Sequence, residues 1–167
     1  MGVEFRLPAG AALLPVVPEQ DVDYQLAFGY PGAAYEVRCA LFPLSRLQAQ
    51  CPQLDLDEYV PAFAVGVIAS IAREDLCYSR LSELPVESVR KEFGADYGLT
   101  ALLKGGKCAF SQGYNYVVVN VLYKKEAGLV LVYMLYNDPA ELGMDGPRFG
   151  AAYYCFRFGL TQSLPDR

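Results

Sequence analysis

The stretch GYNYVVVNVLYKKEAGLVLVYMLYND, residues 113–138, decides the fold of this chain. It holds two strongly apolar runs, which the charged segment KKEAG at residues 124–128 separates. Alternate side chains of a β-strand point to opposite faces, and both faces of each run are apolar. Because strands this apolar aggregate when they lie at an edge, the pattern predicts a central β-hairpin that is covered on both faces. Each run has about ten residues, whereas a helix that spans a bilayer needs about 20.

Two helices are predicted ahead of this hairpin. The segment LDLDEYVPAFAVGVIASIARED, residues 54–75, carries one apolar stripe with helical spacing. Asp57 is its expected N-cap, and Pro61 stands in the expected first turn. The segment SELPVESVRKEFG, residues 82–94, has the pattern of a shorter helix that Ser82 caps and the last glycine ends.

Alternation of apolar and polar residues predicts further strands on both sides of the helices. These segments are residues 3–7, 22–28, 34–41, 95–103, 108–110 and 153–158. A proline-rich connector with Pro15 and Pro18 follows the first of them. The chain of 167 residues has a length that suits one domain. We therefore predict a single α+β domain, residues 1–167, with a mainly antiparallel central sheet of about 6–7 strands flanked by helices.

Glu36 and Arg38 are the charged residues of the strand predicted at residues 34–41. They stand two positions apart, so they share one face of that strand. Because charged side chains are rarely buried, the pattern predicts a solvated charge pair on the outer face of the hairpin.

The composition excludes several chemistries. The chain has no histidine, so a Ser-His-Asp or Cys-His catalytic pair cannot be assembled from it, and zinc sites with histidine ligands are excluded too. Acid–base catalysis would have to use Asp, Glu, Tyr, Lys or Cys. The net charge is −5, and no cluster of basic residues is longer than the pair Lys124 and Lys125. This charge pattern argues against binding to nucleic acid.

The cysteines predict neither disulfide bonds nor a metal site. They are Cys39, Cys51, Cys77, Cys108 and Cys155. Their number is odd and no C-x-x-C pair occurs, so we expect reduced, buried thiols, with Cys51 the most exposed. The segment ALLKGGKC, residues 101–108, differs from the phosphate-loop motif at its first glycine and at its hydroxyl position. The sequence therefore predicts no cofactor and no metal.

Two short motifs are candidates for a binding site at a junction between helix and sheet. The first is GADYG, in which Asp96 and Tyr97 lie where the chain leaves the second helix. The second is GYNY, in which Tyr114 and Tyr116 begin the central hairpin. Asn120 is the one strongly polar residue within the hairpin strands. It either meets a partner in the core, which we favour, or lines a pocket.

The first ten residues, MGVEFRLPAG, lack the basic region and the long apolar region of a secretory signal peptide. A cytoplasmic protein without a membrane span is therefore expected. The alternative is an exported protein whose signal has been removed from the sequence.

The order of the predicted elements resembles that of the PsbP-like superfamily. The likeness lies in DYQLAFGYPGAAYEVRCALFPL, in YVPAFAVGVIASIA and in the hairpin stretch at residues 113–138, and it spans most of the chain. This superfamily is an α/β/α sandwich shared by photosystem II extrinsic proteins, Mog-type Ran-binding proteins and assorted bacterial proteins. The resemblance implies an antiparallel sheet flanked by helices and a non-catalytic role in binding or assembly. It implies no site residue.

We predict a non-enzymatic domain that binds a protein partner or a small ligand, because histidine and catalytic motifs are missing. The alternative is an enzyme that uses Asp, Tyr or Lys in a pocket at the helix–sheet junction, with Asp96 and Tyr97 as its candidates. A deep pocket lined by charged groups with shifted pKa values would favour the enzyme. A flat apolar patch would favour binding of a protein partner. The sequence predicts no particular oligomeric state.

Overall fold

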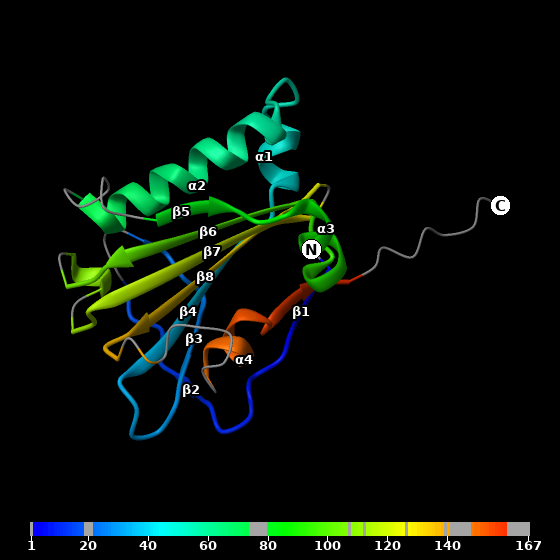
Figure 1. The fold of residues 1–167 in the computed structure, drawn as a ribbon. Coiled ribbons are helices and arrows are strands. Elements are labelled where there is room, and N and C mark those ends of the chain that lie inside the picture. The colour runs from blue at the N-terminus through cyan, green and yellow to red at the C-terminus, as the bar shows by residue number, and fades with distance from the viewer. Residues whose placement is uncertain are drawn as a thin grey trace.

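The computed structural model describes residues 2–18, 22–73, 80–106, 108–111, 113–125, 127–138, 140 and 148–159. The prediction for Cys77 lies outside these residues. Seven of the described strands are β2 (Ala12–Leu14), β3 (Leu26–Gly29), β4 (Tyr35–Phe42), β5 (Arg80–Glu83), β6 (Tyr97–Lys104), β7 (Tyr116–Lys124) and β8 (Gly128–Tyr136). They form one antiparallel sheet with the order β2-β3-β4-β8-β7-β6-β5 (Figure 1). This arrangement confirms the predicted α+β class and antiparallel sheet.

The central hairpin is confirmed. Strands β7 and β8 pair with each other over their full length, and β6 and β4 flank them on the outer sides. All nine residues of β8 are buried. Side chains from both faces of β8 belong to hydrophobic clusters, one on each side of the sheet. The hairpin is therefore the middle of the fold, as its two apolar faces predict.

Helix α2 (Leu56–Ala72) crosses one face of the sheet, beside the short helix α1 (Ser45–Gln50) that the sequence did not predict (Figure 1). Its cap is Asp55 rather than the predicted Asp57: the Asp55 carboxylate accepts a 2.8 Å hydrogen bond from the backbone N–H of Asp57. Pro61 therefore stands within the helix rather than in its first turn. No helix among the described residues is both long and apolar enough to cross a membrane.

Short elements cover the opposite face of the sheet. They are α3 (Val86–Ser88), the π-helical turn η2 (Val89–Phe93), α4 (Phe149–Tyr153) and a separate two-stranded sheet of β1 (Val3–Phe5) and β9 (Phe156–Phe158). Gly94 ends the helical segment with φ 63°, as predicted. Ser82 does not cap it, because Ser82 lies within β5. Residues 80–83 are extended rather than helical, because β5 pairs with β6 as an edge strand of the sheet.

Several boundaries differ from the predicted ones. The strand predicted at residues 108–110 is a 3-10 turn, Ala109–Ser111. The strand predicted at residues 153–158 is shortened to β9, because Tyr153 ends α4. The proline-rich connector contains β2, which pairs with β3 just ahead of Pro15. Each of these segments is short, so tertiary pairing rather than local pattern decides its conformation.

The predicted solvated pair is largely covered: Arg38 is buried and Glu36 is half-buried. The Arg38 side chain is 10% exposed and donates from Nε to Glu36 Oε1 over 2.6 Å. A second donation reaches the carbonyl oxygen of Phe110 over 2.6 Å. The guanidinium also lies over the rings of Tyr24 and Phe110, 5.2 and 4.8 Å from their centroids. The prediction was wrong because segments distant in sequence cover this face of β4.

The described cysteines agree with the prediction of free thiols. Cys39, Cys108 and Cys155 are buried, and Cys51 is partly exposed. Burial is the main cause that raises the pKa of the Cys39 thiol. The hydrogen bond with Cys155 and the charge of that residue raise it further. This thiol is therefore protonated at neutral pH and packs as a small apolar group.

Candidate functional site

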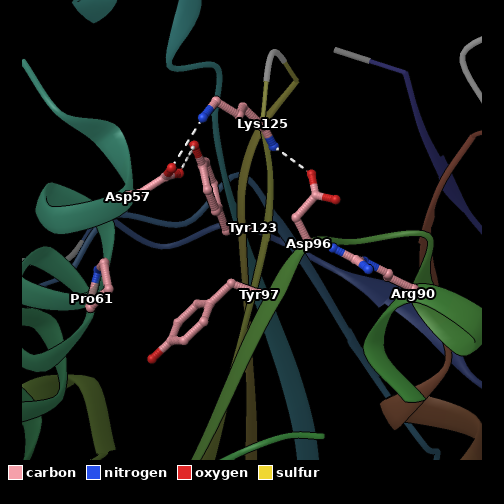
Figure 2. Close-up of a pocket in the computed structure, with 7 residues that line it drawn as sticks. All are labelled: Asp57, Pro61, Arg90, Asp96, Tyr97, Tyr123 and Lys125. Carbon is pink, nitrogen blue, oxygen red and sulfur yellow. Dashed lines mark hydrogen bonds and ion pairs between the residues drawn. The ribbon is translucent and has the colours of Figure 1, made fainter. Parts of the chain in front are cut away.

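Three elements meet at one end of the sheet. They are the N-terminal part of α2, the start of β6, and the end of β7 with the hairpin turn that follows it (Figure 2). Tyr97 of β6 lies directly opposite Tyr123 of β7 in the antiparallel register. Since opposite residues of paired strands share a face, both rings stand on the face that α2 covers.

A cavity of about 390 Å³ lies between these elements. Its lining residues are Asp57, Pro61, Arg90, Asp96, Tyr97, Tyr123 and Lys125. Figure 2 shows Asp57 and Pro61 on α2 at one side, the two tyrosines at the sheet, and Arg90 reaching toward Asp96 from the far side. The volume is within the range of small-molecule sites, about 300–1,000 Å³.

Lys125 connects the two carboxylates of the cavity. Its ammonium lies 3.0 Å from Asp57 Oδ2, and its backbone N–H donates over 3.0 Å to Asp96 Oδ2. The backbone N–H of Asp96 in turn donates over 2.7 Å to the carbonyl oxygen of Tyr123. These bonds attach the hairpin turn to the N-terminal part of α2 on one side and to the start of β6 on the other (Figure 2).

Both tyrosines of the cavity are weaker acids than free tyrosine. Burial, followed by the carboxylates of Asp57, Asp96 and Asp55, raises the pKa of Tyr123 to about 12. Burial also raises the pKa of Tyr97, and Glu83 adds to the rise. The two hydroxyls are therefore protonated at neutral pH and donate over 3.4 Å, Tyr123 to Asp57 and Tyr97 to Glu83.

The structure separates the five residues that the sequence offered as site candidates. Asp96 and Tyr97 line the cavity, whereas Tyr114 and Tyr116 lie at the opposite end of the sheet, where Tyr116 pairs with Lys104. Strands β6 and β7 are antiparallel, so the motifs that begin them lie at opposite ends and form no common site.

The other three candidates have structural contacts. Tyr114 donates over 3.0 Å to Glu36, and the Tyr116 ring stacks on that of Tyr136 at 5.4 Å. Asn120 is buried and accepts a 2.7 Å hydrogen bond from Thr100, as the favoured interpretation of a core partner predicts. Its residue number is even, so its side chain points away from the face that carries Tyr123.

Sequence reasoning missed five lining residues: Asp57, Pro61, Arg90, Tyr123 and Lys125. Asp57 and Pro61 were assigned to the start of a helix, and Lys125 to a hairpin loop. One signal was present: the alternation of the hairpin strand places Tyr123 last on its face, next to a turn rich in charge. No comparable signal relates Arg90 to this corner.

Two further hollows lie on the opposite face of the sheet. One of about 590 Å³ is bordered by Phe158 and Gly159, where the described chain ends. The other, of about 290 Å³, lies between η2 and α4 beside Phe93 and Tyr154. Neither contains Asp96 or Tyr97. Within the described ranges, no group of three or more Cys, Asp or Glu side chains could hold a metal ion.

We predict that the free energy of unfolding falls between pH 10 and about pH 12. The pKa values of Tyr114, Tyr123 and Tyr153 rise from 10.0 to about 12 in the folded protein, with burial as the first cause. In this window the unfolded chain has lost protons that the folded chain keeps, so stability decreases as the pH rises. Urea unfolding at stepped pH measures this loss, and Y123F should show a shallower one. A stability that stays constant to pH 12 would contradict the prediction.

No family model matches this chain, and no curated protein matches it at a significant level.

Proposed function

We propose that this protein is a non-catalytic binding domain that holds a small molecule in the cavity between α2 and the β6–β7 end of the sheet. One observation carries the proposal: charged and hydroxyl side chains from α2, η2, β6 and β7, with the residues next to these strands, converge on a cavity of about 390 Å³. A small number of convergent polar groups in a concave, partly aromatic site is typical of small-molecule binding.

The directions of the pKa shifts favour binding over catalysis. Charged groups line the cavity, as they would in an enzyme, and three of its side chains, Tyr97, Tyr123 and Lys125, have raised pKa values. A general base works best with a pKa near the working pH. The pKa values of Tyr97 and Tyr123 move away from neutrality, to about 12 for Tyr123. At neutral pH both hydroxyls can donate hydrogen bonds to a ligand but cannot accept a proton from it.

The PsbP-like sandwich is part of this proposal. It is supported by an antiparallel sheet with α2 on one face and α4 with η2 on the other. The five-residue length of α4 is a departure from two full helical layers. A non-catalytic role is what the resemblance implies.

Binding of a protein partner is a second candidate, which the exposed edge strand β2 favours. Leu13 is 61% exposed, and Val16 and Val17 beyond it are 45% and 55% exposed. Residues 7–18 include no charged side chain, although charges usually protect an edge strand from pairing. Binding of a partner whose strand pairs with β2 should be lost in L13D, whereas binding of a small molecule in the cavity should not change.

The cavity is tested by NMR of the 15N-labelled protein with a library of small neutral and charged fragments. We expect saturable shifts of the backbone amides of Tyr97, Tyr123 and Lys125 for at least one fragment. D96A should weaken that binding because it removes a lining carboxylate and the acceptor for the Lys125 N–H. E87Q, an exposed change outside the lining, is the matched control. Unchanged binding by D96A, or shifts confined to other surfaces, would refute this function.

A further inference from the structure

We propose that the ligand of the cavity is a small organic cation, an amine whose ammonium replaces that of Lys125 at Asp57. This inference rests on the proposed function, since it names the chemical class of the ligand that the same cavity holds.

The ammonium of Lys125 shows where a cation is held. It lies 3.0 Å from Asp57 Oδ2, and the two side chains are 63% and 59% exposed. An ion pair this exposed contributes little to the stability of the fold, because water screens the two charges. A ligand that carries its own ammonium can therefore take this position without breaking a strong interaction.

Carboxylates outnumber cations around the cavity. Asp57 and Asp96 line it together with Arg90 and Lys125. Two further carboxylates act on the lining side chains: Asp55 on Tyr123 and Lys125, and Glu83 on Tyr97.

The nearby ammonium of Lys124 is bound to the carbonyl oxygen of Gly94, 2.7 Å away. The hydrogen bond of Asp55 to the N–H of Asp57 neutralises part of the positive end of α2. The balance of charge favours a cationic ligand.

The walls of the cavity suit an amine with an apolar frame. Tyr97 and Tyr123 lie side by side on the sheet, and aromatic faces attract cations. Pro61 forms the opposite wall and has no N–H to donate to the carbonyl oxygen of Asp57 four residues earlier. A ligand ammonium can meet the Asp57 carboxylate while its apolar frame lies between Pro61 and the two rings.

The test compares three probes of one shape: benzylamine, benzyl alcohol and benzoate. Each is titrated into the labelled protein, and the dissociation constant is taken from the shifts of the Tyr97, Tyr123 and Lys125 amides. We expect benzylamine to bind most tightly. K125M should tighten benzylamine about two- to fivefold, because the internal competitor is removed. D57N should weaken it about tenfold, because the charge-assisted hydrogen bond is lost. E87Q should leave it unchanged, and unfolding midpoints check that each variant folds.

The opposite responses identify which claim fails. If benzyl alcohol or benzoate binds the cavity as tightly as benzylamine, or if K125M weakens benzylamine, the inference is wrong and small-molecule binding stands. The inference is also overturned if other fragments bind the cavity and benzylamine does not. If no fragment and no probe shifts the amides of the cavity, both the inference and the proposed function fall.

Discussion

The substitution R38M is expected to lower the free energy of unfolding by about 3 kcal/mol, the lower end of the effect of breaking a buried ion pair, because Glu36 is only half-buried. Arg38 neutralises the Glu36 carboxylate and donates to the carbonyl oxygen of Phe110. Methionine keeps the apolar length of the side chain but removes the charge and every N–H donor of the guanidinium. The carboxylate would then retain the hydrogen bond from Tyr114 and lose its cation. Urea unfolding followed by circular dichroism measures the change.

R6M is the matched control for R38M. The Arg6 side chain is 87% exposed and lies 3.9 Å from Glu4, so its loss should change the unfolding free energy by less than about 0.5 kcal/mol. The double variant E36Q/R38M should recover part of the stability that R38M loses, because no unpaired carboxylate remains. If R38M unfolds at the wild-type urea concentration, or if E36Q/R38M is no more stable than R38M, the buried pair does not have this role.

The substitution L131A is expected to lower the free energy of unfolding by about 2–5 kcal/mol, as for other fully buried leucines. Leu131 of β8 is 0% exposed and pairs with Val121 on one side and Ala40 on the other. It lies in the cluster that packs under α2. The loss combines the removed apolar surface with the space that these central strands cannot fill.

The control for L131A is L13A on the edge strand β2. Leu13 is 61% exposed, so the same chemical change should cost less than about 0.5 kcal/mol. Equal losses at the two positions would show that the hairpin is not the centre of the fold. A double variant should be additive, because the two side chains share no partner.

The fold could be predicted where local pattern and burial agree. The two runs at residues 113–138 are apolar on both faces, and only a central position removes both faces from water. The apolar stripe of α2 is equally clear. Short elements such as β2 and the turn at Ala109 escaped prediction, and β9 was predicted to begin three residues too early, since three residues carry too little pattern and the pairing partner decides. Arg38 was misplaced because the rings that enclose it come from other parts of the chain.

The candidate site could be predicted only in part. Asp96 and Tyr97 were found because two glycines mark the junction where they lie. Asp57 and Lys125 were not found as site residues. The two partners of this ion pair lie 68 positions apart in the sequence. Each also has an adequate local explanation, Asp57 at a helix start and Lys125 in a hairpin turn. A site made from side chains of several elements becomes visible only when the strand register and the path of α2 are known.

A crystal structure of the protein soaked with benzylamine and with the neutral fragments tests the central claim most directly. The account predicts a bound molecule between Pro61 and the rings of Tyr97 and Tyr123, with the benzylamine ammonium within hydrogen-bond distance of Asp57 and the Lys125 side chain turned away. A cavity that remains free of every soaked molecule, while Lys125 stays on Asp57, would contradict it.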